Sequence, residues 1–314
     1  MDLTIGNLGK MKLLTHLNYV NIVAKTGSIR KAAEQLNITS TALNRRILAL
    51  EEELGGPIFE RLPQGVRLNV AGELVIQHIR KSMADLSKVT SQIADLSGVR
   101  RGHIKLAGGS EVIGRFLPGR IASYREDHAH VSFEILRRNP EQAMRALQDY
   151  DADLSFIFGP VPATEFQILA SVMVNLGVMV HHSHPLAEMD VITIDHCFDY
   201  PAILPAEGTG LYQLLYHAQA KTGISFRQAV ISESYDFMFN YSQFENAITF
   251  MLPLDAHDSH PSRDYVIKPL KANELVTGRL HLTQLKGRVL PVASAKFAEN
   301  IIQYFNENFP ENTT

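Results

Sequence analysis

The stretch from Ser28 to Gly55 constrains the fold of this chain more than any other segment. It reads SIRKAAEQLNITSTALNRRILALEEELG, and two short amphipathic helices joined by a tight turn account for its apolar spacing. Ala32 and Ala33 are small enough for the two helices to touch, and Asn37 tolerates the positive φ that such a turn requires. The segment therefore predicts two helices packed at a steep angle, which is a helix-turn-helix.

The polar face of the second helix is suited to the edges of base pairs. Its apolar residues share one side, so hydroxyl, amide and guanidinium groups occupy the other side near the N-terminal end, where a recognition helix enters the major groove. Ser28 and Arg30 begin the preceding helix at positions typical of phosphate contacts, and Arg61 and Arg67 flank a predicted hairpin turn at Pro63-Gln64-Gly65. A plain helical hairpin with a solvated polar face is the alternative. The expected DNA contacts are Ser28, Arg30, Thr39, Ser40, Thr41, Asn44, Arg45, Arg61 and Arg67.

Several motifs of this region together resemble those of LysR-type transcriptional regulators. The matching residues are Gly27-Ser28, Ala32-Ala33-Glu34-Gln35-Leu36, Thr39–Leu43, Leu50-Glu51, Leu54-Gly55, Ile58-Phe59-Glu60-Arg61 and Leu68-Asn69-Val70-Ala71-Gly72. Thr41 stands where the family usually has proline and Asn44 where it usually has serine, so the resemblance implies an operator with unusual bases. It also implies an α/β fold: an N-terminal winged helix-turn-helix and a long linker helix, then a two-lobed, periplasmic-binding-protein-like α/β effector domain.

A repeat of apolar positions after the hairpin predicts a long helix. Positions 75, 79, 82, 86, 89, 93 and 96 alternate spacings of four and three, and only Ser82 among them is polar. This period of 3.5 is typical of a coiled coil, and about 26 helical residues span about 39 Å, more than a small domain covers. The alternative is an amphipathic helix folded back on its own domain. The expected dimerisation residues are Val75, Ile79, Leu86, Val89, Ile93 and Leu96, and a homodimer or a homotetramer of two dimers is expected.

Charge divides the chain into two parts. Residues 1–102 carry 14 Lys and Arg against 9 Asp and Glu, whereas residues 103–314 carry 16 against 24. A basic part on an acidic body indicates one module for phosphate and another for a different task. The sequence has no apolar run of about 18 residues and no secretory signal, and it contains a single cysteine, Cys197. These features predict a cytoplasmic protein without a membrane partner.

Strand and helix patterns alternate beyond residue 103, which is typical of parallel βαβ units. The expected domains are a winged helix-turn-helix over 11–70, a linker helix over 71–99, lobe I over 103–163 and 266–314, and lobe II over 164–265. Ligands of such folds bind at the carboxyl ends of strands, beside helix N-termini. Ser, Asn and Thr are also ordinary helix caps, and Glu111 disfavours a carboxylate effector. The expected effector contacts are Ser110, Glu111, Asn139, Pro160, Thr209 and Tyr235.

An enzyme with a helical N-terminal extension is the competing interpretation. His181, His182 and His184 form a metal-like cluster, but they lack a cysteine or carboxylate at ligand spacing, so a surface loop is favoured. Motifs for a phosphate-binding loop, a dinucleotide fold or a nucleophile elbow do not occur in the sequence. We therefore expect no catalytic residue, metal or cofactor. The expected function is regulation of transcription by binding double-stranded DNA, modulated by a small-molecule effector, with RNA polymerase as a further partner.

Overall fold

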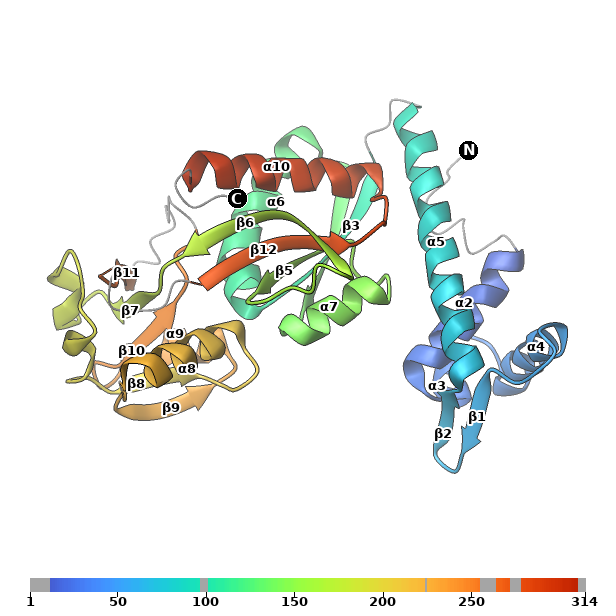
Figure 1. The fold of residues 1–314 in the computed structure, drawn as a ribbon, viewed down its shortest axis with the longest axis horizontal. Helices are drawn as coiled ribbons and strands as arrows, with labels where there is room; N and C mark the ends of the chain where they lie inside the picture. The colour runs from blue at the N-terminus through green and yellow to red at the C-terminus, as the bar shows by residue number, and fades with distance from the viewer. Residues whose placement is uncertain (1–11, 97–100, 224, 255–263, 272–277, 310–314) are drawn as a thin grey trace. The chain divides into compact units, whose positions relative to one another are not determined.

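The computed structural model describes residues 12–96, 101–223, 225–254, 264–271 and 278–309 (Figure 1). The chain divides into two compact units, residues 1–99 and 100–314. No helix in the described ranges is long and apolar enough to cross a membrane.

The first unit is a bundle of helices with a two-stranded hairpin. Its core is formed by small or branched side chains from four helices; Val23, Ala32, Leu43 and Ile76 are each completely buried. Asn37 has the positive φ that the sequence predicted for the turn between the two helices, and Gly27 has one at the turn before the first of them. The predicted helix-turn-helix is therefore confirmed. Its elements are α2 (Lys12–Thr26), α3 (Ile29–Gln35), α4 (Ser40–Glu53), β1 (Phe59–Leu62), β2 (Gly65–Leu68) and α5 (Val70–Leu96).

The hairpin of β1 and β2 is attached to the turn before α3. The two strands are antiparallel, with Leu62 opposite Gly65, so the connection is the two residues Pro63 and Gln64. The Val66 backbone N–H donates to the Gly27 carbonyl at 2.9 Å. A methyl group on Gly65, which has a φ of 150°, would lie 2.2 Å from that same carbonyl oxygen. Only glycine permits this approach, which holds the wing beside the helix-turn-helix.

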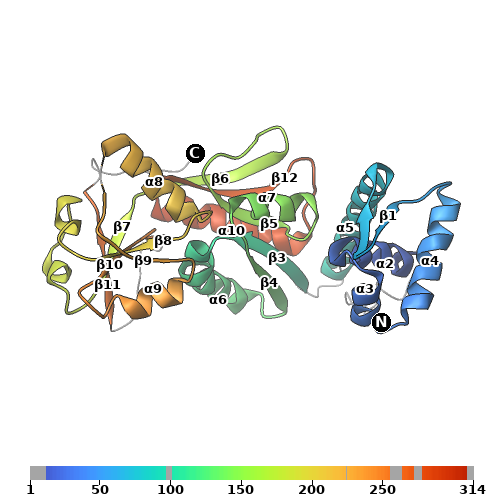
Figure 2. The same cartoon turned by 90° about the horizontal axis from the view of Figure 1, so that it is seen from below.

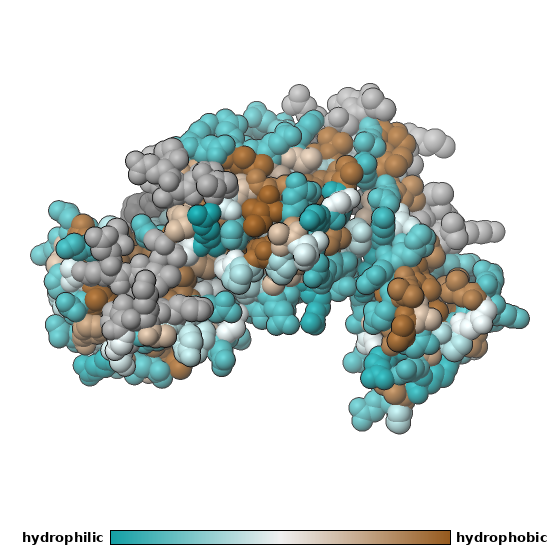
Figure 3. Space-filling view, in the orientation of Figure 1, coloured by the Kyte–Doolittle hydropathy of each residue, from teal (hydrophilic) through white to brown (hydrophobic). Residues whose placement is uncertain are grey.

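The long helix α5 uses its apolar positions in two ways. Ile79 is 2% exposed and Val75 packs beside it, both against the core of their own unit. The first two positions of the predicted seam are therefore covered within the chain, as the alternative interpretation expected. The later positions are half-buried or exposed, namely Leu86, Val89 at 45% and Ile93 at 44%, and Figure 3 shows apolar side chains gathered along this part of the helix. The side chain of Leu96 lies outside the described residues.

The first lobe of the second unit contains a five-stranded sheet in the order β4-β3-β5-β12-β6. Strands β4, β3 and β5 are parallel, and β12 runs antiparallel to both β5 and β6. Helices α10 and α6 lie on one face and α7 on the other (Figures 1 and 2). Its elements are β3 (Gly102–Gly108), η1 (Val112–Phe116), α6 (Leu117–Asp127), β4 (Val131–Arg137), α7 (Pro140–Gln148), β5 (Leu154–Phe158), β6 (Phe166–Val174), β12 (Gly278–Leu285) and α10 (Val292–Asn308).

The second lobe contains another five-stranded sheet, in the order β11-β7-β10-β8-β9. Alternate residues of β8 face opposite sides: Ala202 joins the main core with α8, while Ile203 packs in a small cluster with Met238 of α9. The two helices therefore cover opposite faces of this sheet. Its elements are β7 (Gly177–His181), β8 (Ala202–Pro205), α8 (Gly210–Thr222), β9 (Gln228–Ser232), α9 (Tyr235–Tyr241), β10 (Ile248–Met251) and β11 (Tyr265–Pro269), with short 3-10 turns at Pro185–Glu188 and Asp195–Cys197.

The boundary between the lobes differs from the one predicted. Residues 166–174, assigned by sequence to lobe II, form β6 in the sheet of lobe I, and residues 266–269, assigned to lobe I, belong to β11 in the sheet of lobe II. Both errors have one cause. The segments that connect the lobes are strands paired antiparallel to distant partners, and that pairing leaves no local signal in the sequence.

Candidate DNA interface and effector site

The N-terminal end of α4 presents polar side chains to solvent. The Thr39 hydroxyl caps the helix by accepting the Ala42 backbone N–H at 3.2 Å. Leu43 and Ile47 are buried, which turns Ser40, Thr41 and Arg45 outward into solvent. Among the described residues Arg45 has no hydrogen-bond or ion-pair partner, so its guanidinium is available to a ligand. This arrangement suits a recognition helix.

Arg61 connects the wing to the recognition helix. Its Nη2 donates to Asn44 Oδ1 at 3.0 Å, although the two residues lie 17 positions apart. The bond from Arg61 orients the half-buried Asn44 amide and leaves its nitrogen and a second lone pair of Oδ1 for a further partner. The neighbouring Arg46, by contrast, is held inside the unit, donating to the Tyr19 hydroxyl at 2.6 Å with its guanidinium 4.9 Å from that ring. Two consecutive arginines therefore have different roles, one structural and one exposed.

Two other predicted contacts are ion-paired on the surface. Arg30 lies 2.7 Å from Glu34 and Arg67 lies 2.6 Å from Glu60, and all four side chains are largely exposed. Exposed pairs of this kind contribute little to stability and exchange readily for other anions. Ser28 serves as the N-cap of α3, accepting the Lys31 backbone N–H at 3.4 Å. The Arg30–Glu34 pair could be expected from its i,i+4 spacing on one helix, whereas the Arg67–Glu60 pair depends on the register of β1 and β2.

In the second unit, several predicted effector contacts gather around the N-terminus of α8. A methyl group on Gly210 would lie 3.0 Å from Glu111 Oε1 and 2.9 Å from Phe158 Cβ, so the first turn of α8 lies directly against lobe I. The corresponding position on Gly208 is 4.0 Å from the amide nitrogen of Asn139. The Cβ position on Gly159, which precedes the exposed Pro160, is 3.8 Å from Gln213. Residues from the ends of β3, β4 and β5 therefore meet one helix of lobe II.

Glu111 is the central residue of this meeting point. It is only 7% exposed and precedes a π-helical turn, η1, a wide turn often found at functional sites. Burial raises the pKa of its carboxyl group, and a hydrogen bond from its own backbone N–H lowers it by less. The Tyr235 hydroxyl, from the start of α9, is buried and has no hydrogen-bond partner within the part of the chain that the structure describes. Burial and the nearby Glu111 charge raise its pKa well above the usual value.

Family models match both units of the chain. A model described as "Bacterial regulatory helix-turn-helix protein, lysR family" matches residues 14–73, and one described as "LysR substrate binding domain" matches residues 97–306. The chain belongs to the LysR family. The LysR fold and the function implied by the sequence motifs are thereby confirmed: this is a transcriptional regulator with a DNA-binding head and an effector-binding body.

Known LysR-type proteins align with nearly the whole chain. The transcriptional dual regulator GltC of Bacillus subtilis is 24% identical over 296 residues, covering 94% of this chain and 98% of that protein. Full-length CbnR in a complex with its target DNA has a TM-score of 0.62 at 17% identity, covering 92% of this chain and 99% of that one. The effector-binding domain of QuiR in complex with shikimate has a TM-score of 0.53 at 18% identity, covering 67% and 99%.

Two effector residues predicted for this LysR-family chain already use their polar atoms inside the fold. Asn139 caps α7 in a reciprocal capping box with Gln142. The Thr209 hydroxyl accepts the Tyr212 backbone N–H at 3.1 Å and donates to the Ala206 carbonyl at 3.0 Å. Ser110, at the end of β3, has no such partner among the described residues and is half-buried. It therefore remains the more available hydroxyl of the set.

The structure also reveals residues that the sequence reasoning did not single out. Arg115, one turn after Glu111, carries its guanidinium 5.5 Å from the Phe239 ring and 4.0 Å from the Met251 sulfur, both in lobe II. Gly210 and Phe158 form the close contact between lobes described above. Among the local features of the sequence, only the glycine that directly follows Thr209 could have indicated this contact.

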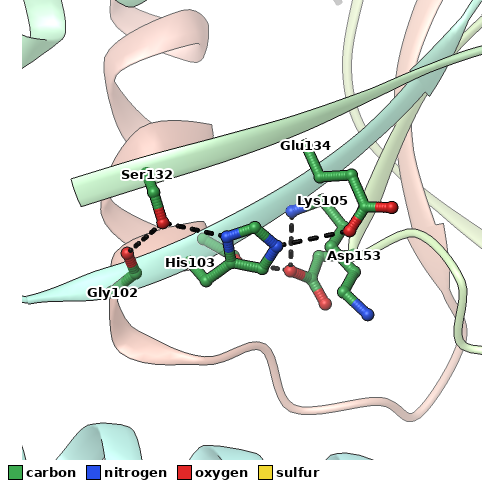
Figure 4. Close-up of polar contacts among 7 residues, drawn as sticks. Gly102, His103, Lys105, Ser132, Glu134 and Asp153 are labelled. Atoms are coloured by element: carbon green, nitrogen blue, oxygen red, sulfur yellow. Dashed lines mark hydrogen bonds and ion pairs between the residues drawn. The ribbon is translucent and has the colours of Figure 1, made fainter. Parts of the chain in front are cut away.

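A Ser-His-Glu arrangement on β3 and β4 bears on the competing enzyme interpretation (Figure 4). His103 lies 2.9 Å from the Ser132 hydroxyl and 3.3 Å from the Glu134 carboxylate. The Ser132 hydroxyl, however, donates its proton to the Gly102 carbonyl at 3.3 Å, so it accepts rather than donates toward His103. A serine in this arrangement is not activated as a nucleophile. The three residues form a cross-strand polar cluster at a sheet edge.

The histidine run has structural partners. His184 is 2% exposed; its Nδ1 accepts the Leu186 backbone N–H at 3.0 Å, so its Nε2 donates to the Asn246 carbonyl, also at 3.0 Å. Burial lowers its pKa. His181 and His182 are directed to Ser183 and to the Asp264 carbonyl. Within the described ranges, no group of three His, Cys, Asp or Glu side chains is arranged to hold a metal ion.

Proposed function

We propose that this LysR-type regulator reads its operator through the exposed N-terminal face of α4 and the adjacent wing. The observation that carries the proposal is the exposed, unpartnered guanidinium of Arg45 beside Asn44, whose amide is oriented by Arg61. Arginine and asparagine are the side chains that pair bidentately with guanine and adenine. The cap residues Ser28 and Thr39 supply backbone N–H groups for phosphates. The proposed contacts are Ser28, Arg30, Thr39, Ser40, Thr41, Asn44, Arg45, Arg61 and Arg67.

The protein is proposed to bind DNA as a homodimer, with a tetramer of two dimers as the larger assembly. The exposed apolar stretch of α5 from Leu86 to Ile93 supports this, because a second copy is the simplest cover for a repeated apolar seam. Two recognition helices related by a twofold axis contact two half-sites. RNA polymerase is proposed as a further partner, and the cytoplasm is the proposed location.

A small-molecule effector is proposed to bind where α8 meets lobe I, beside Ser110, Glu111 and Tyr235. A ligand moves a conformational equilibrium only if it binds one arrangement more tightly than the other. This site contains groups from both lobes, so a bound molecule is sensitive to their relative arrangement. The complex of QuiR with shikimate supports a small molecule as effector in a related body. The proposed function needs no catalytic step.

Binding to the DNA upstream of the protein's own gene tests the proposal. We expect full-length protein to bind this fragment more tightly than a scrambled fragment, and Arg45→Ala to lose about 1–3 kcal/mol on the specific fragment only. Arg145→Ala is the matched control, because it removes an exposed arginine of the body that pairs only with Glu141. Wild-type affinity in Arg45→Ala would refute the groove assignment.

A further inference from the structure

Two buried carboxylates of the body differ in their surroundings. Asp153 is 5% exposed and is surrounded by donors: the Lys105 backbone N–H at 3.1 Å (Figure 4), the Ser294 hydroxyl at 2.9 Å and the Arg288 guanidinium. Glu111 is 7% exposed and has no ion-pair partner among the described residues. Asp153 is thus a completed structural ion pair, whereas Glu111 is a buried acid without a counter-charge.

The buried hydroxyl of Tyr235 is the second incomplete group, and it comes from the opposite lobe. Its oxygen has no hydrogen-bond partner among the described residues, yet it lies close enough to Glu111 for that charge to affect it. Buried polar groups in folded proteins are nearly always paired, and each exception calls for an explanation. Here the unpartnered Tyr235 hydroxyl of lobe II lies near the Glu111 carboxyl group of lobe I, which lacks a counter-charge among the described residues, at the site proposed above for the effector.

The chemistry of these two groups restricts what can satisfy them. An ionised carboxylate only accepts hydrogen bonds, while a phenol can donate one and accept one. A second carboxylate would place like charges together in a buried position, which is costly. A cationic N–H donor satisfies the carboxylate with charge-assisted hydrogen bonds, and the Tyr235 hydroxyl can hydrogen-bond the same molecule.

We propose that Glu111 and Tyr235 select an effector that carries a cationic nitrogen, such as an amidinium, guanidinium or ammonium group, and reject carboxylates. The Glu111 carboxylate accepts the N–H donors, and the Tyr235 hydroxyl hydrogen-bonds the same part of the molecule from lobe II. The proposal rests on the effector function proposed above and adds the charge of the ligand. It distinguishes this chain from a regulator that senses an organic acid at the same place.

Isosteric probes that differ only in charge test the proposal. We would measure the binding of acetamidine, acetamide and acetate, and of benzamidine, benzamide and benzoate, to the full-length protein by calorimetry and ligand-observed NMR. In each set the cation is expected to bind about tenfold more tightly than the neutral amide, with no binding of the acid. In Glu111→Gln the preference for the cation is expected to fall to within about threefold.

The controls separate the site from general charge effects. Glu126→Gln removes an exposed carboxylate at the far end of the same helical segment and is expected to keep the cation preference. Tyr235→Phe is expected to weaken the amidines without restoring binding of the acids. The proposal is overturned if the acids bind wild-type protein as well as the amidines do, if Glu111→Gln leaves the preference intact, or if no amidine binds.

Operator affinity measured with the same probes distinguishes this inference from the proposed function. If amidines bind through Glu111 but leave operator affinity unchanged, the charge selection stands and effector control fails. If an acid binds and changes operator affinity, effector control stands and the charge selection fails.

Discussion

Replacing Glu111 by glutamine is expected to stabilise the body of this regulator. The side chain is 7% exposed, lacks a counter-charge among the described residues and accepts a hydrogen bond from its own backbone N–H. Glutamine has nearly the same shape and keeps an oxygen acceptor for that bond, but it carries no charge to desolvate. Most buried substitutions destabilise a protein, so a gain in stability is a distinctive outcome.

The expected gain in the free energy of unfolding of Glu111→Gln follows from opposing contributions. An uncompensated buried charge costs about 3–5 kcal/mol. Against this, the carboxylate gains about 0.3–1 kcal/mol from the positive end of its helix, and its hydrogen bond is about twice as strong as a neutral one, which adds about 1 kcal/mol. The net gain for Glu111→Gln is therefore about 2 kcal/mol. For a domain of this size that corresponds to a rise in melting temperature of about 4–8 °C.

The gain is also expected to depend on pH. Because burial raises the folded-state pKa of Glu111 above the value of 4.5 for a free carboxyl, the folded protein keeps this proton to a higher pH than the unfolded chain does. The stability that the protonated Glu111 carboxyl group preserves in the wild-type protein is complete below pH 4.5. This stability is lost as pH rises through the folded-state pKa and the buried group becomes charged. The melting temperature of the variant minus that of wild type should therefore be small in acid and reach its full value above that pKa.

Calorimetric unfolding of the full-length proteins between pH 4 and 8 measures this difference. Asp153→Asn is the matched control, because it leaves Arg288 buried without its counter-ion and should cost about 3–5 kcal/mol. Opposite signs for the two substitutions are the expected result. A Glu111→Gln protein that is less stable than wild type at neutral pH would show that a compensating charge holds this carboxylate, and would refute the reasoning.

Three further substitutions test the DNA-binding unit and its assembly. Arg61→Ala should weaken binding to all DNA sequences and lower the salt-dependence slope by about one if Arg61 contacts phosphate. An added loss on the operator is expected, because Asn44 loses the donor that orients its amide; an unchanged salt slope would contradict the phosphate contact. Leu86→Glu places a charge in the exposed seam and should shift the protein to monomers in sedimentation, whereas an intact dimer would exclude this surface. Gly65→Ala forces a methyl group against the Gly27 carbonyl and should lower the stability of the unit by about 1–3 kcal/mol. Its DNA affinity should fall as well. An unchanged melting curve would mean that the wing is not anchored there.

The sequence predicted those features that depend on neighbours along the chain. The positive φ of Asn37 and the outward position of Ser40, Thr41 and Arg45 follow from residue type and helical spacing. The length of α5 also followed from its apolar period. The period does not show which of its positions are covered by the chain's own unit. Ile79 is buried there because of where the three preceding helices lie.

The effector site was predicted less completely, for a related reason. Capping and ligand binding favour the same residue types at helix N-termini, so the sequence could not separate a cap such as Thr209 from a ligand contact such as Ser110. The approach of Gly210 to Glu111 joins residues about a hundred positions apart and has no periodic signal. The same holds for β6, whose place in the first sheet is fixed by pairing with β12.

The central claim is that the first unit docks on DNA through two copies of α4. A hydroxyl-radical footprint of the full-length protein on the DNA upstream of its gene tests this most directly. We predict two protected patches whose centres are about one helical turn, 10–10.5 base pairs, or a multiple of it apart. Arg45→Ala is expected to abolish both patches at the same protein concentration. Uniform protection, a single patch or a footprint that survives this substitution would contradict the account.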